Sequence, residues 1–428
     1  MSKRKADAED ELSPTKRAKL ERTLSEEQNA ILDTVLRGQS IFFTGSAGTG
    51  KSYLLKKVLA GLPTKGTYVT ASTGVAACHI GGTTLHGFAG FKPGSGQLPR
   101  KKEQWRNAKR LVIDEISMVD GDWFDELEEV ARKVRGNSKP FGGIQLIVCG
   151  DFLQLPPVSK TGETKKFCFE ARTWKKCMKH CVELQEVHRQ SDPTFIDLLR
   201  RVRFGVTAAE DLQTLKETGS NVVDYDGIEA TQLCTHVKDA AEINTNKLRM
   251  LPGVTKTFAA RDDVGGDYYA TKILDASCRA PGKLELKVGA QVMLVKNINV
   301  QKGLANGSRG VIAGFSGQGL PIVKFVSGLR ETMRRESWTV GIGQGRVATR
   351  QQIPIQLAWG ISIHKSQGMT LDAVQVDLGK VFECGQAYVA LSRARTLEGL
   401  RVKNFSARSV RANASVLRFY KQLSDASE

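Results

Sequence analysis

The sequence predicts an α/β protein, with parallel sheets covered by helices on both faces and a small β-barrel inserted into that framework. A helix is expected over residues 24–38, behind a Ser-x-x-Gln capping box formed by Ser25 and Gln28. Apolar runs typical of strands then alternate with helical segments: SIFFTG, GTYVTA, RLVIDE and IQLIVCGD. Between residues 284 and 353 the sequence pattern changes and predicts short strands separated by Gly, Asn and Pro, with no helix evident. The alternating pattern of helices and strands resumes with IQLAWGISIHKSQG and continues to Phe405.

Composition and charge limit which classes of protein are possible. A chain of 428 residues is long enough for two or three domains, at roughly 100–200 residues each. No unbroken apolar run of about 18 residues exists, so the sequence predicts no membrane span. The formal net charge of +18 favours a polyanionic partner, most often nucleic acid, although the charge could simply aid solubility.

The eight cysteines are scattered through segments that look like strands and helices, which is not a disulfide framework. One local cluster contains Cys168, Cys177, His180 and Cys181. A zinc site needs two closely spaced pairs, and only CMKHC is close. Buried free thiols therefore explain the cluster better than zinc does.

Residues 1–23 are almost all polar, so we expect a disordered basic tail. Two basic clusters between residues 3 and 19 are similar to a bipartite nuclear-localisation signal; the alternative is a merely solvated tail. Acidic residues between the clusters argue against a mitochondrial presequence, although a mitochondrial isoform stays open. Ser13 lies in a Ser-Pro-Thr-Lys stretch that resembles a proline-directed kinase site.

GSAGTGKS fits the phosphate-binding loop G-x-x-x-x-G-K-[ST] in full and lies between a predicted strand and a predicted helix. Its glycines let backbone N–H groups close around phosphates at a helix N-terminus, where the helix dipole favours an anion. Lys51 would reach the outer phosphates, and the Ser52 hydroxyl would ligate Mg²⁺. The alternative is a glycine turn with a chance lysine. The loop residues assigned to nucleotide binding are Gly45, Ser46, Ala47, Gly48, Thr49, Gly50, Lys51 and Ser52.

Two further strand ends supply candidate catalytic side chains. Asp114 and Glu115 follow the apolar run RLVI, at the carboxyl end where ligands of such sheets bind. Asp114 suits the Mg²⁺, and Glu115 suits activation of a water molecule, which separates an NTP hydrolase from a kinase. Gln154 lies just beyond another strand, where an amide can sense the γ-phosphate. No [NT]-K-x-D motif is present, which favours ATP over GTP.

Seven ordered segments resemble a single family. They are TASTGVAACHIGGTTLHGFAG, LVIDEISMVDGDWFDELEEVAR, PFGGIQLIVCGDFLQLPPV, LKVGAQVMLVKN, NGSRGVI, AWGISIHKSQGMTLD and QAYVALSRARTLEGL. In this order they resemble the Pif (petite integration frequency) family of superfamily 1B DNA helicases, and most closely its eukaryotic members. The resemblance runs from Leu24 to about Phe405. The chain departs from those members in its short N-terminal tail and in having hardly any C-terminal extension.

The resemblance implies two RecA-like P-loop domains that hold ATP between them, with single-stranded DNA lying across both. It also implies a small wedge insertion in the first domain and an SH3-like barrel insertion in the second. The expected bounds are 24–158 for the first domain, about 87–107 for its wedge, 159–283 and 354–420 for the second domain, 284–353 for its barrel, and 421–428 for a frayed C-terminus.

The resemblance alone implies several site residues. Arg189 and Arg393 match the arginines that stabilise charge on the transferring phosphoryl group. Gln28 matches the glutamine that reads adenine, a use that competes with its capping box, and Gly368 is assigned to the nucleotide. The residues assigned to DNA are Ser72, Thr73, Thr84, His86, Phe88, His364, Lys365, Ser366, Gln367, Gln386 and Tyr388, with Lys287, Lys296 and Asn306 of the barrel as further candidates.

Other roles stay open for some of these side chains. Core packing is the alternative for Phe88. His86 and His364 could equally be satisfied core histidines.

The resemblance implies an ATP-dependent helicase that uses Mg²⁺, moves 5′ to 3′ along single-stranded DNA and unwinds duplex, forked and G-quadruplex DNA. The family acts in replication, repair, recombination and telomere maintenance. Nothing in composition or spacing encodes the polarity. Three alternatives stay open: a DNA-stimulated translocase or remodeller with little unwinding, an RNA-directed helicase, and a nucleotide-gated binding protein. The tail favours the nucleus, and a monomer is expected, with a DNA-induced dimer left open.

Overall fold

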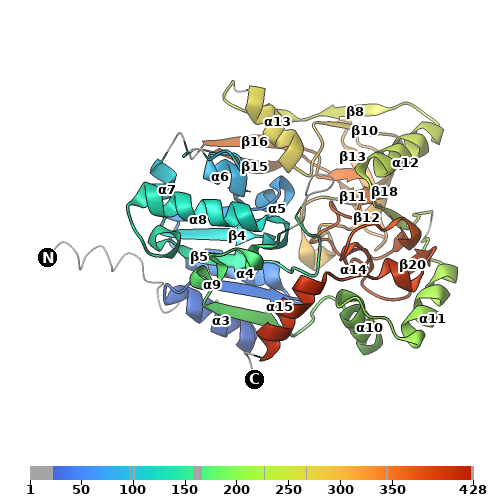
Figure 1. Cartoon of the computed structure of the whole chain (residues 1–428). Coiled ribbons are helices and arrows are strands. Elements are labelled where there is room, and N and C mark those ends of the chain that lie inside the picture. The colour runs from blue at the N-terminus through green and yellow to red at the C-terminus, as the bar shows by residue number, and fades with distance from the viewer. Residues whose placement is uncertain are drawn as a thin grey trace.

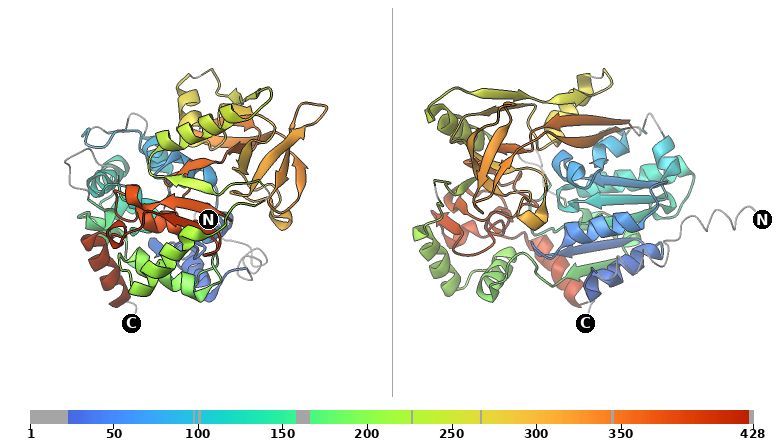
Figure 2. Two further views of the ribbon diagram at one scale, coloured as in Figure 1. Left: turned by 90° about the vertical axis from the view of Figure 1, so that its right-hand side faces the viewer. Right: turned by 180° about the vertical axis from the view of Figure 1, so that it is seen from behind.

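A computed structural model describes residues 23–96, 98–99, 102–157, 166–225, 227–266, 268–343 and 346–425. The predicted localisation signal and Ser13 lie outside these residues. Two α/β units lie side by side, with antiparallel strands packed against the second (Figures 1 and 2). No helix in the described part of the chain is long and apolar enough to cross a membrane.

The first unit is built on a six-stranded parallel sheet with the strand order β3-β2-β4-β5-β1-β6. Its strands are β1 (Ile41–Gly45), β2 (Thr67–Ala71), β3 (Thr83–Thr84), β4 (Arg110–Asp114), β5 (Gln145–Cys149) and β6 (His180–Leu184). Side chains alternate across the sheet, so Ile41 and Phe43 pack on one face while Phe42 packs on the other.

Helices cover both faces of this sheet, as the alternating pattern predicted. One face carries α3 (Glu26–Leu36), α4 (Lys51–Gly61) and α5 (Gly74–His79). The other carries α6 (Leu85–Ala89), α7 (Glu103–Asn107), α8 (Gly121–Arg135) and α9 (Trp174–Cys177). The predicted capping box begins α3: the Gln28 N–H donates to Ser25 Oγ, and the Ser25 N–H donates to Gln28 Oε1.

The second unit has a four-stranded parallel sheet with the order β18-β7-β19-β20. Its strands are β7 (Thr231–Cys234), β18 (Gly360–Ser362), β19 (Val374–Asp377) and β20 (Leu400–Lys403). The accompanying helices are α10 (Pro193–Arg203), α11 (Ala209–Glu217), α12 (Val237–Met250) and α14 (Gln386–Leu391). Phe195 and Leu198 of α10 and Val389 of α14 share its core. The two parallel sheets confirm the predicted fold class.

An antiparallel sheet interrupts the second unit, as predicted from the change of texture. Its order is β14-β13-β12-β11-β17. The strands are β11 (Gln291–Leu294), β12 (Arg309–Phe315), β13 (Pro321–Phe325), β14 (Arg330–Thr332) and β17 (Ile355–Leu357). β17 falls outside the predicted range 284–353. It pairs with β11 and closes the edge of the sheet.

A long hairpin within the predicted barrel range belongs to a different sheet. β15 (Glu336–Gly343) pairs with β16 (Arg346–Gln352), and β16 pairs with β9 (Arg261–Asp263). The hairpin lies over α6 at the top of Figure 1, where Thr83 Oγ1 donates to Gly341 O at 2.9 Å. The remaining elements are the pair β8 (Lys256–Ala259) and β10 (Lys283–Leu286), and helix α13 (Tyr268–Ser277), which packs on α5.

The predicted boundary between the units at residue 158 is too early. β6, which ends at Leu184, pairs in parallel with β1 along five residues, so the first unit extends at least that far. The predicted boundary rested on motif order. Motif order does not reveal that a later strand adds to the edge of the earlier sheet.

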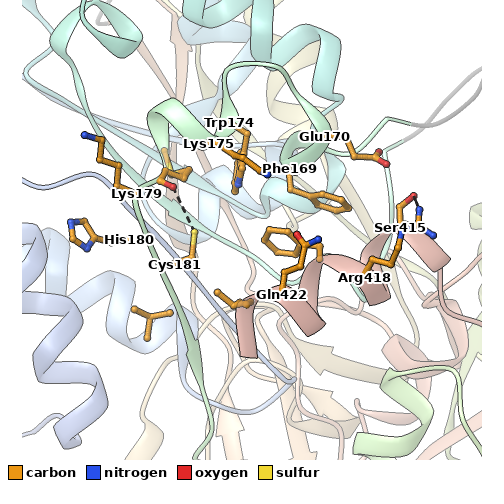
Figure 3. A pocket seen from close by; sticks show the side chains of 14 residues that line it. Phe169, Glu170, Trp174, Lys175, Lys179, His180, Cys181, Ser415, Arg418 and Gln422 are labelled. Carbon is orange, nitrogen blue, oxygen red and sulfur yellow. Dashed lines mark hydrogen bonds between the residues drawn. The ribbon is translucent and has the colours of Figure 1, made fainter. Parts of the chain in front are cut away.

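The position of helix α15 (Ala414–Asp425) contradicts two further predicted domain bounds. One assigned residues 354–420 to the second unit, and the other assigned residues 421–428 to a frayed C-terminus. Val416, Tyr420 and Leu423 of α15 are buried in the core of the first unit. Figure 3 shows the side chains of α15 facing those of α9 and β6 across a cavity of about 610 Å³. The first and the last of the described helices, α3 and α15, therefore both pack on the first sheet.

The predicted wedge at about 87–107 contains the end of α6 and the short helix α7. Trp105 of α7 is fully buried against Phe88, so this helix is anchored to the core of the first unit. Residues 97, 100 and 101 lie outside the described residues. Whether the segment separates DNA strands stays a prediction.

Candidate nucleotide site and nucleic-acid face

The glycine-rich loop connects β1 to α4, as its sequence predicts. Gly45, Gly48 and Gly50 have φ values of 148°, 97° and 79°, which favour residues without a side chain. A β-carbon on Gly48 would lie 2.8 Å from Arg189 Cβ, so the loop and the second unit approach closely. Lys51 Nζ donates to Gly45 O at 2.7 Å and to Ser46 O at 2.9 Å, which holds the ammonium across the loop.

Asp114 ends β4, and Glu115 follows it in a left-handed conformation with φ of 53°. Non-glycine residues with positive φ are strained and tend to occur at functional sites. Burial raises the pKa of Glu115 to about 7, and the neighbouring Asp114 carboxylate adds to that shift. A carboxyl group with a pKa near neutrality can exchange a proton with a substrate at physiological pH. Glu115 therefore has the environment of a general base.

Two buried arginines lie close to the nucleotide site: Arg393 interacts electrostatically with Glu115, and Arg189 lies beside Gly48 of the loop. Arg393 is 1% exposed, and its guanidinium donates to Val389 O and Ser392 Oγ, both at 2.8 Å. Burial lowers the pKa of Arg393 to about 9, and Arg189 lowers it further while Glu115 opposes the shift. Arg189 donates to Ser392 O at 2.9 Å. Neither arginine forms an ion pair with a carboxylate of the described residues, so both remain available to an anionic ligand.

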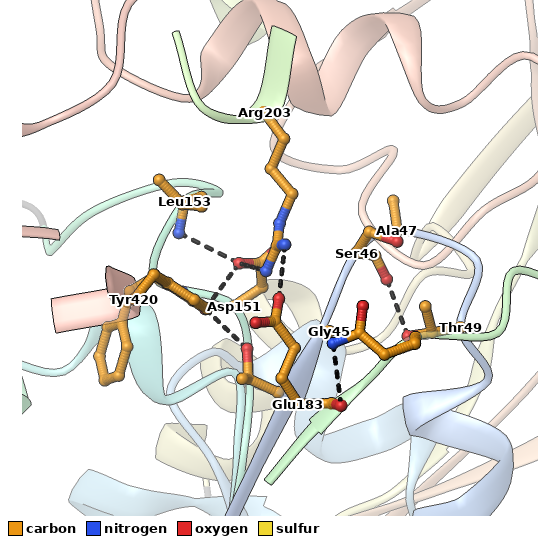
Figure 4. Close-up of polar contacts among 12 residues, drawn as sticks. Gly45, Ser46, Ala47, Thr49, Asp151, Leu153, Glu183, Arg203 and Tyr420 are labelled. Carbon is orange, nitrogen blue, oxygen red and sulfur yellow. Dashed lines mark hydrogen bonds and ion pairs between the residues drawn. The ribbon is translucent and has the colours of Figure 1, made fainter. Parts of the chain in front are cut away.

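Gln154 is positioned by a buried network that the sequence did not predict; Figure 4 shows its members Asp151, Arg203, Glu183 and Tyr420. Its Nε2 donates to Asp151 Oδ2 at 3.3 Å. Asp151 is fully buried and accepts hydrogen bonds from the guanidinium of Arg203 and from the Tyr420 hydroxyl. Arg203 also donates to Glu183 Oε1 at 2.6 Å. Asp151 lies two residues beyond the end of β5, which could have indicated a role, whereas Arg203 and Tyr420 carry no local signal.

The two predicted uses of Gln28 are compatible. Its Oε1 forms the capping box, whereas its Nε2 lies 3.0 Å from where a β-carbon on Gly50 would be. The amide nitrogen therefore faces the loop while the oxygen caps α3.

Tyr388 of α14 contacts the nucleotide loop, so the structure gives no support to its predicted contact with DNA. The hydroxyl accepts a hydrogen bond from the Ala47 N–H at 2.6 Å, and the side chain is 2% exposed. Three other residues assigned to DNA are also buried, and their contact with DNA stays a prediction: Phe88 packs in the first core, Gln386 Oε1 accepts from the Phe382 N–H, and Ser366 Oγ donates to Ile363 O. Membership of a motif does not reveal which side of an element faces solvent.

Four of the remaining candidates for DNA contact, Thr73, His364, Lys365 and Gln367, lie near the acids. Residues from both units line a cavity of about 130 Å³: Ser52, Thr73, Asp114, Glu115, His364, Lys365, Gln367 and Gly368 are among them. His364 and Lys365 are exposed. Thr73 caps α5 by accepting from the Ala76 N–H, and Thr84 caps α6 by accepting from the Gly87 N–H. Ser72 is partly buried beside Thr73.

His86 is exposed and stacks on Trp123, with ring centroids 4.0 Å apart. One face of its ring is thereby occupied by the protein. Among the barrel candidates, Lys287 Nζ donates to Leu251 O, and Lys296 pairs with Glu336 at 2.8 Å. Asn306 lines an adjoining cavity with Lys296.

The hydroxyl of Ser52 and the carboxylate of Asp114 line the same cavity and are the oxygen ligands that Mg²⁺ prefers. Burial raises the pKa of Asp114, a cost that a divalent cation would offset. These two residues therefore fit the predicted metal.

Comparisons with known proteins agree with this geometry. The model of the PIF1-like helicase family matches residues 23–213, and that of the DNA helicase Pif1 2B domain matches residues 271–315. The chain is 56% identical over 413 residues to the rat ATP-dependent DNA helicase PIF1, covering 94% of this chain and 64% of the rat protein. It therefore spans less than two thirds of that relative's length.

Solved structures extend the similarity to three dimensions. A crystal structure of Pif1 helicase from Candida albicans is 40% identical, covers 94% of this chain and 99% of its own, and superposes with a TM-score of 0.73. Bacteroides Pif1, 30% identical, superposes with a TM-score of 0.80 when unliganded, covering 94% of this chain and 97% of its own. The structure of Bacteroides Pif1 bound to single-stranded DNA gives 0.65, covering 94% and 98%. The chain belongs to the PIF1-like helicase family.

Proposed function

We propose that this chain is an ATP-dependent DNA helicase that moves 5′ to 3′ along single-stranded DNA and unwinds duplexes. The observation that carries the proposal is the convergence of Lys51 and Glu115 from one unit with Arg189 and Arg393 from the other around one phosphate-binding loop. A site assembled from two units couples the state of the nucleotide to their separation. Its relatives from rat and Bacteroides carry the same name, helicase.

Each residue of the nucleotide site has its own role in ATP hydrolysis. Backbone N–H groups of the loop and Lys51 bind the phosphates, and Gln28 Nε2 faces the base. Ser52 and Asp114 would hold Mg²⁺, which supplies charge neutralisation for the β- and γ-phosphates. Glu115 accepts the proton of the attacking water, while Gln154 orients that water or the γ-phosphate. Arg189 and Arg393 stabilise the charge that develops on the transferring group.

DNA binding follows from the neighbouring surface. Thr73, His364 and Lys365 lie beside the acids, so a strand bound there would contact both units. A structure of Bacteroides Pif1 bound to single-stranded DNA and a structure of two coordinating Pif1 helicases at forked duplex DNA support this choice of ligand. The finer proposals are G-quadruplex DNA as a further substrate, a nuclear location with a mitochondrial isoform open, and a monomer that can dimerise on DNA.

The test uses two forked duplexes, one with a free 5′ single-stranded tail and one with a free 3′ tail, incubated with ATP and Mg²⁺. Strand release is expected only from the 5′-tailed fork. The matched control is Glu115→Gln, which keeps the shape of the site and removes the base. Release from the 3′-tailed fork alone would overturn the polarity.

A translocase or remodeller with little unwinding is the second candidate. The observation favouring it is the short predicted wedge, in which α7 spans only Glu103–Asn107. DNA-stimulated ATP turnover without strand release from either fork would support this function instead.

A further inference from the structure

Arg279 lies between α13 and β10, and its side chain enters the cavity of about 130 Å³ that also contains Ser52, Asp114 and Glu115. Its Nη2 donates to Gln367 O at 3.0 Å. Its Nε and Nη1 are buried and have no hydrogen-bond partner. A buried donor without a partner costs roughly 1–3 kcal/mol, and more when the group is charged. Two such donors on a single guanidinium therefore call for a ligand.

The other buried arginines indicate what a purely structural arginine looks like in this chain. Arg203, Arg309 and Arg350 are each at most 3% exposed, and each binds at least one carboxylate through two hydrogen bonds. Arg393 is equally buried but has no carboxylate partner, and it faces the nucleotide loop. Arg279 likewise forms no ion pair with a described carboxylate. Arg279 therefore resembles Arg393, the arginine without a carboxylate partner, and not the three structural arginines.

The surroundings of Arg279 are positively charged. Lys56 lies nearby, with its Nζ 3.2 Å from His79 Nε2, and Lys365 lines the same cavity. Burial lowers the pKa of His79 to about 4, so this imidazole is neutral at neutral pH. Burial lowers the pKa of Arg279 to about 10, which leaves the guanidinium charged at neutral pH. Asp114 and Glu115 also line the cavity, and a divalent cation would neutralise Asp114. The local charge thus favours an anion next to Arg279.

The size of the cavity limits the ligand. A volume of about 130 Å³ is well below the roughly 300–1,000 Å³ of typical small-molecule sites, so a whole nucleotide does not fit. A single tetrahedral oxyanion does. Guanidinium groups donate charge-assisted hydrogen bonds to such oxyanions, and Nε and Nη1 of Arg279 are two donors without a partner.

We propose that Arg279 binds a phosphate group in this cavity. The cavity borders the acids of the nucleotide site on one side and Thr73 and Lys365 on the other, so the phosphate comes either from the nucleotide after cleavage or from the DNA backbone. The proposal rests on the proposed function for these two sources. The bound phosphate links the nucleotide site to the DNA face. When Arg279 binds this phosphate, its hydrogen bond to Gln367 O couples phosphate binding to the position of Gln367.

The experiment compares Arg279→Gln and Arg279→Lys with the wild-type chain. The control is Arg172→Gln, which removes an equal charge from a side chain that is 86% exposed. One arm titrates inorganic phosphate into the ADP-bound protein by calorimetry. The other measures binding of a single-stranded DNA oligonucleotide at several salt concentrations without nucleotide.

A phosphate that comes from the nucleotide predicts at least tenfold weaker binding of inorganic phosphate in Arg279→Gln, with the salt dependence of DNA binding unchanged. A DNA phosphate predicts a salt slope that falls by about 0.7 for the one lost contact, with phosphate binding unchanged. Arg279→Lys should show a smaller change of the same kind, because it keeps the charge and loses the guanidinium donors.

Values equal to those of Arg172→Gln in both arms, with an unchanged unfolding temperature, would overturn the proposal and leave Arg279 only a hydrogen bond to Gln367. Should Arg279→Gln not fold, the same comparison between Arg279→Lys and the control decides the question. Neither arm requires strand separation. Failure of the proposed helicase activity is therefore seen in the forked-duplex assay and not here.

Discussion

Arg203 connects the two units, and replacing it tests the energetics of the site most directly. The residue ends α10, whose apolar side chains belong to the core of the second unit. Its guanidinium donates to both carboxylate oxygens of Asp151, at 3.0 and 3.2 Å, and to Glu183 at 2.6 Å, all within the first unit. Burial opposes ionisation of Asp151 most strongly, but Arg203 and Lys51 outweigh it and lower the pKa of this carboxyl.

The expected cost of Arg203→Met follows from these contacts. Three charge-assisted hydrogen bonds at roughly 1.5–3 kcal/mol each set an upper bound of about 9 kcal/mol. Methionine fills part of the space, and Glu183, 17% exposed, regains some hydration. Removing one member of a buried ion pair typically costs about 3–5 kcal/mol, and we expect a loss of this size in the free energy of unfolding.

Urea denaturation followed by tryptophan fluorescence measures the effect at pH 7, since Trp105, Trp123 and Trp174 report on the first core. The matched control is Arg200→Met on the same helix, whose 3.5 Å pair with Asp197 is half exposed and should contribute about 0–1 kcal/mol. The penalty of Arg203→Met should shrink as the pH falls toward the pKa of the carboxyls. An Arg203→Met loss no larger than that of the control would refute the reasoning.

Three further outcomes are expected. Lys51→Ala should abolish ATP hydrolysis and leave the affinity for single-stranded DNA within about twofold, because Lys51 contacts only the loop; retained turnover would contradict the assignment. Glu115→Gln should raise the unfolding temperature of the protein in EDTA, by an amount that grows between pH 4.5 and about 7 and then stays constant, since the folded state raises the pKa of this acid over that interval; an equal gain at all pH values would argue against the shift. Lys365→Ala should lower the salt slope of DNA binding by about 0.7, and an unchanged slope would mean that Lys365 contacts no phosphate.

The hairpin formed by β15 and β16 connects the inserted strands to the first unit. Its Gly341 accepts from Thr83 and leaves no room for a side chain, because a β-carbon there would lie 2.7 Å from Thr83 Cβ. This hairpin and Arg203 are thus two of the places where the second unit contacts the first, and the hydrogen bond between Ala47 and Tyr388 is another.

Local sequence was sufficient for the catalytic half of the nucleotide site. The loop from Gly45 to Ser52 depends on backbone conformations that glycine allows, and Asp114 and Glu115 follow an apolar run whose strand character is evident. These features are encoded by neighbouring residues, so a single sequence reveals them. The capping box of Ser25 and Gln28 is local in the same way, and it formed as predicted.

Contacts between residues far apart in the chain were decided only by the folded structure. Tyr388 looked like a DNA contact and instead binds Ala47, 341 positions away. Tyr420 of α15 donates a hydrogen bond to Asp151. Arg279 lines the same cavity as Asp114 and Glu115, although it is far from them in the sequence. The physical reason is that an amphipathic helix or a buried side chain specifies that it must be covered, but not by what. That choice depends on the packing of the whole chain, which no local pattern records.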